Sequence, residues 1–176
     1  MTISFARFLP SLATEIGMFG VAMRKSLTGW WCSMIILIDD REKQPFEFPG
    51  VETETARLET GDYTVKGFED SFAVERKSLN DLATSVGSGR ERFEAEIQRA
   101  QDMNEFTVII EGTYQEAQNG AYYSNIHPNA VTGTTEKWPL KYGILNFEWC
   151  GTPNAASQEA LRLLDRWYLK EASDLF

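Results

Sequence analysis

The sequence predicts an α/β domain in which a mixed β-sheet is flanked by helices on both faces. Residues 35–38 (Ile-Ile-Leu-Ile) are apolar at consecutive positions, which is typical of a strand buried on both sides of a sheet. Two Ser-x-x-acid patterns, at Ser78 and Ser88, are typical of helix starts. Apolar residues at helical spacing after Pro153 predict a last helix. Strands and helices therefore alternate along the chain.

From Met34 onward the sequence predicts six strands and four helices. The predicted strands cover residues 35–38, 52–58, 63–65, 72–75, 106–111 and 144–150. Of these, 63–65 and 72–75 are expected to pair as a hairpin across a loop at Gly67. The predicted helices run from Ser78 to near Gly87, over 89–103 and 131–142, and onward from Pro153. Residues 113–129 are expected to form a loop.

Residues 1–33 differ from the rest of the chain. Their apolar residues follow a helical period that Pro10 interrupts. Glu15 breaks the apolar stretch, which argues against a secretory signal, and no run is long enough for a membrane span. A helix that binds a membrane surface or a partner stays open. We favour an extension ahead of a natural start at Met34, with one domain over 34–176.

Charge and cysteine content limit the function and the compartment. The net charge of −9 argues against a simple nucleic-acid binder, which is usually basic. Net charge does not describe the field at one cleft, and bound cations would offset acids gathered there. Cys32 and Cys150 lie far apart without metal-type spacing, so we expect two free thiols in a reducing, cytoplasmic compartment.

A spaced acidic pattern carries the chemistry. Asp62 is followed after twelve residues by Glu75-Arg76-Lys77, and the predicted hairpin would bring the acids together. Two carboxylates on neighbouring strand ends suit a hard divalent cation such as Mg²⁺. Lys77 lies on the same strand face as Glu75 and would orient or help deprotonate an attacking water. These residues predict a metal-dependent phosphodiesterase.

Further residues complete the predicted site. Asp39, at the end of the first strand, would join Asp62 and Glu75 as a metal ligand. Arg76 would point to the other face, leaving its backbone carbonyl for the metal. The candidates for phosphate contacts are Arg41, Arg90 and Arg92.

Plainer interpretations stay open for several of these residues. Two interpretations of Asp81 are equally favoured: a supporting catalytic role, and the third helix position of the Ser78 capping box. Asp62 could hydrogen-bond its own turn, and Lys77 could form a surface ion pair with Glu75. The arginines could be ordinary surface charges. His127, which precedes a proline, is better explained as a loop residue than as a general base.

The ordered motifs resemble the XPF-type nuclease family over residues 35–112. The family signature G-D-x(n)-E-R-K-x(3)-D is matched by Gly61, Asp62, Glu75, Arg76, Lys77 and Asp81. Its upstream D-x-R-E is matched by Asp39, Arg41 and Glu42. The resemblance implies catalytic roles for Asp39, Arg41, Asp62, Glu75, Arg76, Lys77 and Asp81.

The resemblance also implies a fold, a cofactor and a substrate. It implies a restriction-endonuclease-like fold, Mg²⁺ or Mn²⁺ as cofactor, branched DNA such as flaps and forks as substrate, and a homodimer through the nuclease domain. The tandem helix-hairpin-helix module common in the family is not expected here, as in minimal versions from phages and microbes, for which the compartment would be the host cytoplasm. Two alternatives stay open: a nuclease without structural preference, and a non-catalytic scaffold that binds DNA or a partner.

Overall fold

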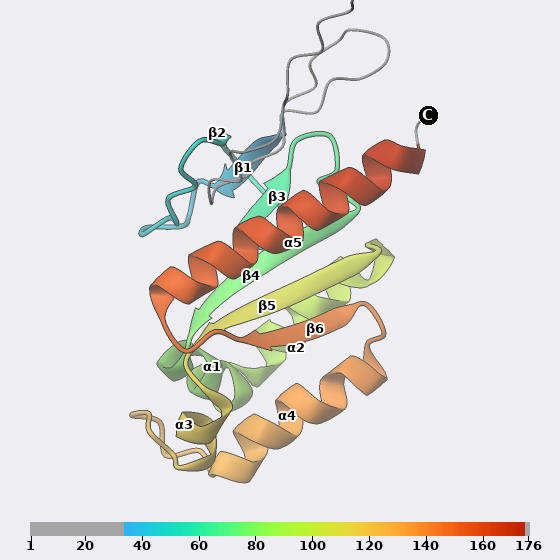
Figure 1. Ribbon diagram of the computed structural model, residues 1–176. Helices are drawn as coiled ribbons and strands as arrows, with labels where there is room; N and C mark the ends of the chain where they lie inside the picture. Colours follow the sequence, from blue (N-terminus) through green and yellow to red (C-terminus); the bar gives the residue numbers. More distant parts are fainter. Residues whose placement is uncertain (1–33, 175–176) are drawn as a thin grey trace, which may run out of the picture. The chain divides into compact units, whose positions relative to one another are not determined.

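A six-stranded mixed sheet runs through the computed structural model, which describes residues 34–174 (Figure 1). The strands are β1 (Ile35–Asp39), β2 (Glu52–Ala56), β3 (Tyr63–Val65), β4 (Phe72–Ser78), β5 (Glu105–Glu111) and β6 (Leu145–Trp149). They lie in the order β2-β1-β3-β4-β5-β6. β3 runs antiparallel to both of its neighbours, and the other pairs are parallel. The predicted α/β class with a mixed sheet is confirmed.

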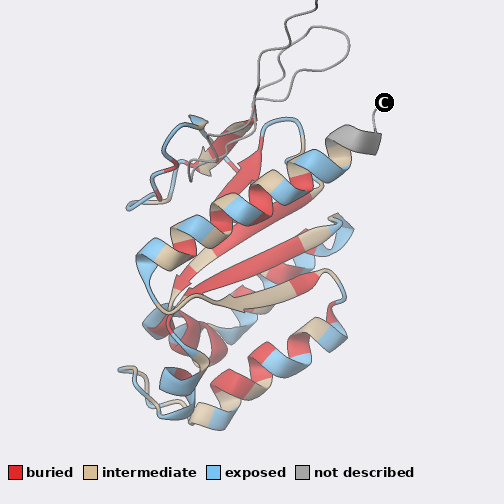
Figure 2. Ribbon diagram, viewed as in Figure 1, coloured by how far each residue is buried: buried red, intermediate tan, exposed pale blue. Residues whose placement is uncertain are grey.

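Helices cover both faces of this sheet. They are α1 (Leu79–Val86), α2 (Arg90–Arg99), α3 (Tyr114–Gln118), α4 (Pro128–Lys141) and α5 (Pro153–Asp174), with a 3₁₀ turn over Ala100–Asp102. One core cluster joins α5 to one sheet face, and a second joins α1, α2 and α4 to the other. Figure 2 shows buried residues along the central strands and as a stripe on α5.

Strand alternation decides which side chains of β4 meet which helices. Phe72 and Val74 belong to the α5 core, and Ala73 belongs to the core under α1 and α2. Since successive strand residues point to opposite faces, Glu75 and Lys77 share the face of Ala73 and lie beneath α2. The predicted shared face of Glu75 and Lys77 is confirmed.

A tight turn at Gly61 brings β1, β3 and β4 into register. Gly61 has φ +78°, and a Cβ there would lie 2.8 Å from the Cβ of Ala73. The next residue, Asp62, donates its backbone N–H to the Val74 carbonyl at 2.8 Å. Its own carbonyl accepts the Asp39 N–H, also at 2.8 Å. Glycine is required here because an L side chain is strained at positive φ and space is lacking.

The α1–α2 corner confirms one predicted helix start and corrects the other. Ser78 caps α1 by accepting the N–H of Asp81, and α1 ends at Gly87 as expected. Ser88 does not cap α2: Gly89 occupies the N-cap position without a side-chain hydrogen bond. The backbone here instead completes the end of α1, because the Gly89 N–H donates to the carbonyl of Thr84. The predicted helix over 89–103 is therefore shorter and ends in the 3₁₀ turn.

The segment predicted as a loop over 113–129 contains more helix than expected. Thr113 and Glu116 form a capping box that opens α3. α4 starts at Pro128 rather than at Val131, because His127 caps it by accepting the Asn129 N–H on Nδ1. His127 therefore caps a helix, where the sequence predicted a loop residue.

Two expectations concern residues that lie partly or wholly outside the described range. The N-terminal extension over 1–33 and the thiol of Cys32 fall outside it. Cys150 is a free thiol. No helix within residues 34–174 combines the length and apolarity needed to cross a membrane.

Candidate active site

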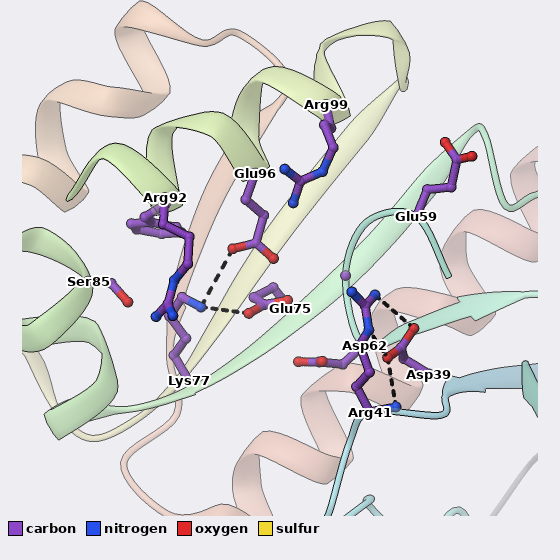
Figure 3. Close-up of a pocket in the computed structure, with 12 residues that line it drawn as sticks. Asp39, Arg41, Glu59, Asp62, Glu75, Lys77, Ser85, Arg92, Glu96 and Arg99 are labelled. Carbon is purple, nitrogen blue, oxygen red and sulfur yellow. Dashed lines mark hydrogen bonds and ion pairs between the residues drawn. The ribbon is translucent and has the colours of Figure 1, made fainter. Parts of the chain in front are cut away.

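A cavity of about 280 Å³ opens where β1, β3 and β4 meet α2 (Figure 3). It brings together six residues that the sequence predicted for the site: Asp39, Arg41, Asp62, Glu75, Lys77 and Arg92. The other lining residues are Glu59, Gly61, Ser85, Phe93, Glu96 and Arg99. Carboxylates from three neighbouring strand regions therefore face a common space that also holds basic side chains.

Asp62 carries a largely buried carboxylate at the centre of this cavity. Its Oδ2 accepts the backbone N–H of Arg76 at 2.8 Å. Burial, followed by the charge of Glu75, raises the pKa of Asp62 to about 8, against the lowering effect of the Arg76 N–H. The competing interpretation, a bond to its own turn, is not the contact observed. Within residues 34–174 this carboxylate forms no ion pair, and the charge of Lys77 lowers its pKa less than burial raises it.

Glu75 and Lys77 form a buried ion pair on the neighbouring strand. Lys77 Nζ lies 2.6 Å from Oε1 of Glu75, and both residues are more than 90% buried. Burial raises the pKa of Glu75, and the nearby Glu96 adds to this, although Lys77 opposes it. Burial alone would lower the pKa of Lys77, but Glu75 and Glu96 together raise it. The pair is thus interior, not a surface ion pair.

Asp39 is held by Arg41 at the edge of the cavity. Arg41 donates Nε to Oδ1 at 2.6 Å and Nη2 to Oδ2 at 3.0 Å. The backbone N–H groups of Arg41 and Leu58 donate to the same carboxylate. Burial would raise the pKa of Asp39, but these donors together lower it. These four donors favour the ionised form of the carboxylate and engage both of its oxygens.

Arg76 contributes its backbone to the cavity and its side chain to the opposite sheet face. The guanidinium donates to Glu111 Oε1 at 2.7 Å and to the Gln44 carbonyl, and it lies 4.7 Å from the centre of the Phe46 ring. These contacts fix the loop after β1 against β5. Arg76 therefore lies on the other face, as the alternation predicted.

Besides Arg76, two predicted site residues lie outside the cavity lining, Asp81 and Arg90. Asp81 is exposed, and its Oδ2 accepts the Ser78 hydroxyl at 2.6 Å within the α1 cap. Arg90 lies over the Trp138 ring at 4.9 Å and pairs with Glu94. The structure thus gives Asp81 the capping contacts, and it directs Arg90 toward α4.

The fit of a divalent cation can be judged from these contacts. Within residues 34–174, no three His, Cys, Asp or Glu side chains are close enough together to hold a metal ion. Of the predicted ligands Asp39, Asp62 and Glu75, which all line the cavity, Asp39 is engaged by Arg41. Asp62 and Glu75 do fit a cation, since two buried carboxylates repel each other and a cation would offset their charge.

Helix α2 adds residues that sequence reasoning missed. Arg92, Glu96 and Arg99 all line the cavity, and their i, i+4, i+7 spacing places them on one helix face. The sequence predicted Arg92 for phosphate contacts but did not single out Glu96 or Arg99, which lie beside the buried apolar face of Phe93 and Ile97. The polar spacing beside that face was the available signal for Glu96 and Arg99.

Comparison with known proteins places the chain in a family. The model of the ERCC4 domain matches residues 38–158. Mouse (Mus musculus) DNA repair endonuclease XPF is 27% identical over 133 residues, and the hamster protein (Cricetulus griseus) of the same name is 26% identical. The chain belongs to the ERCC4-domain family, and the predicted XPF-type resemblance is confirmed.

The curated relatives are much longer than the segment that matches this chain. The match covers 70% of this chain but 14% of the mouse and hamster proteins. A solved structure, XPF from Aeropyrum pernix, matches with a TM-score of 0.55 and 24% identity, covering 73% of this chain and 64% of that one. This likeness supports the XPF-type nuclease fold. The chain spans about one seventh of the length of the mouse and hamster proteins.

Proposed function

We propose that this chain is a divalent-metal-dependent DNA endonuclease of the XPF type. The observation that carries the proposal is the meeting of Asp62, Glu75 and Lys77 in one cavity. Family membership and the names of the matched relatives, which are DNA repair endonucleases, support the same activity.

The residues present suit phosphodiester hydrolysis in distinct ways. Asp62 and Glu75 would hold the cation, Mg²⁺ or Mn²⁺, with oxygen ligands. When bound, the cation supplies an activated water and neutralises charge on the phosphate. The buried amine of Lys77 is positioned to donate a hydrogen bond to a phosphate oxygen or to that water. Asp39 keeps Arg41 at the rim, where its guanidinium can meet a phosphate.

Basic side chains around the rim support a polyanionic substrate. Arg41, Arg92 and Arg99 line the cavity and have exposed side chains, in contrast to the acids beneath them. Guanidinium groups bind paired phosphate oxygens, and such contacts weaken as salt rises. We propose DNA as the substrate, and branched or flapped DNA in repair, recombination or replication as its form.

Cleavage of labelled flap, fork and linear duplexes in Mg²⁺ or Mn²⁺ tests this proposal. We expect faster cutting of branched DNA and no cutting in EDTA. Equal cutting of linear and branched DNA would leave a nuclease without structural preference. Binding without cleavage of any substrate would leave the scaffold function. The homodimer and the intracellular location stay predictions, to be checked by light scattering and by imaging of the tagged protein.

A further inference from the structure

The amine of Lys77 is held by a side chain of its own strand, β4, and by two side chains of α2. Nζ lies 2.6 Å from Oε1 of Glu75 on its own strand. It also lies 3.9 Å from Oε2 of Glu96 and 4.9 Å from the centre of the Phe93 ring. Phe93 and Glu96 are three residues apart on α2, so this helix supplies both an aromatic face and a second carboxylate. Figure 3 shows the Glu96 carboxylate directed toward the Lys77 amine.

The two carboxylates near this amine have different surroundings. Glu75 lies close enough to Asp62 for its charge to raise the pKa of Asp62, and the two carboxylates are the proposed cation ligands. Glu96 approaches the amine from the helix side, and its side chain is 20% exposed. A cation on Glu75 would meet the ammonium on the same carboxylate, where like charges repel strongly at short range in a partly dry site. A cation on Glu75 would therefore weaken the hold of this carboxylate on the ammonium and favour its departure.

A displaced ammonium needs another acceptor because Lys77 is buried. A buried charge without a partner is costly. Glu96 Oε2 is about 1 Å beyond an ordinary charge-assisted hydrogen bond, so rotation at the end of the lysine side chain is enough to reach it. No other carboxylate within residues 34–174 forms an ion pair with Lys77 besides Glu75 and Glu96.

We propose that Glu96 is a positioning residue that receives the Lys77 ammonium when a divalent cation occupies Asp62 and Glu75. This inference rests on the proposed function. The transfer keeps Lys77 charged and beside the cavity while Glu75 turns its oxygens to the cation. Glu96 acts through Lys77 and does not itself touch the reacting phosphate.

The ammonium resonance of Lys77 tests this exchange of partners. A lysine ammonium gives a ¹H–¹⁵N cross-peak when a carboxylate protects it, and Lys77→Met assigns that peak by its disappearance. We expect the peak in the wild type without metal and, shifted, with Mg²⁺. In Glu96→Gln the peak should persist without metal, because Glu75 still holds the amine, and should be lost with Mg²⁺. Glu59→Gln, which removes another carboxylate of the cavity lining without a contact to Lys77, should keep the peak in both states.

The outcomes separate this inference from the proposed function. A peak that persists in Mg²⁺-loaded Glu96→Gln would overturn the role of Glu96 and leave the cation site standing. A peak already lost in metal-free Glu96→Gln would also overturn it, because Glu96 would then be a permanent anchor. No shift in the wild type, together with no heat of Mg²⁺ binding by calorimetry, would overturn the cation site and with it both proposals.

Discussion

The backbone N–H of Arg76 donates a 2.8 Å hydrogen bond to Oδ2 of Asp62, so the residue after Glu75 fixes the carboxylate of the neighbouring strand. This bond and the Asp62–Val74 backbone bond tie the turn at Gly61 to β4. The two candidate ligands are therefore coupled through the main chain. The backbone of β4 thus fixes where the Asp62 carboxylate lies.

Asp62→Asn should abolish cleavage while the protein stays folded. The amide keeps the hydrogen bond from Arg76 but removes the negative charge proposed to bind the cation. Loss of a group that only supports a metal ligand costs 10–100-fold, so we expect a loss of at least roughly 100-fold here. The measurement is the single-turnover cleavage rate. Asp165→Asn makes the same chemical change on α5, across the sheet, and should cleave at the wild-type rate.

Gly61→Ala should destabilise the fold more than Gly67→Ala. Both glycines have positive φ, +78° and +89°, but a Cβ at Gly67 meets nothing within 4 Å. Positive φ costs an L residue about 1–2 kcal/mol. The clash with Ala73 at Gly61 should add about 1–3 kcal/mol. Urea denaturation measures the free energy of unfolding of both variants. Equal losses would show that the turn at Gly61 relaxes to accept the added Cβ.

The metal-free protein should lose stability as pH rises from about 4 to about 8. Asp62 has a pKa of about 8 in the folded state, above its ordinary value of 3.8, so the folded protein binds more protons in this range. The free energy of unfolding therefore falls with rising pH, and the penalty is fully developed above pH 8. One unit of pKa shift corresponds to about 1.4 kcal/mol.

Asp62→Asn removes this titration. In EDTA, its stability relative to the wild type should increase by at least about 1 kcal/mol between pH 6 and pH 8. Thermal unfolding at both pH values measures the difference, which corresponds to about 2–4 °C in Tm. If Tm changed with pH by the same amount in the two proteins, the raised pKa of the buried Asp62 carboxylate would be contradicted.

Asp39→Asn should lower stability more than it lowers cation affinity. The substitution weakens the contacts with Arg41 and Leu58 and leaves buried donors poorly matched, at a cost of about 1–3 kcal/mol. Asp40→Asn, beside it, disrupts only an exposed pair with Arg57 and should cost less than about 1 kcal/mol. Urea denaturation and Mn²⁺ calorimetry on both variants give the comparison. A loss of Mn²⁺ affinity as large as that of Asp62→Asn would restore Asp39 as a direct ligand.

Local patterns in the sequence predicted most of the strands and helices. The consecutive apolar residues of β1, the hairpin of β3 and β4 and the Ser78 cap all depend on residues close in sequence. The same holds for the shared face of Glu75 and Lys77, which follows from strand alternation. The local errors include the Ser88 cap, the start of α4 at Pro128 and the missed α3, although the Thr113 capping box was present in the sequence.

Long-range partners escaped prediction. Arg76 meets Glu111 on β5, 35 positions away, and Asp39 accepts from Leu58. Glu96 reaches Lys77 because α2 crosses β4 at that point. Such contacts are set by how elements pack, and no spacing within one element reveals them. The sequence therefore predicted six of the residues that line the cavity, but neither Glu96 and Arg99 nor the engagement of Asp39 by Arg41.

The most direct test is the anomalous scattering of Mn²⁺ in crystals of the protein. The account predicts one strong peak about 2.1 Å from carboxylate oxygens of both Asp62 and Glu75. A peak bound by other residues, or none at a Mn²⁺ concentration that supports cleavage, would contradict it.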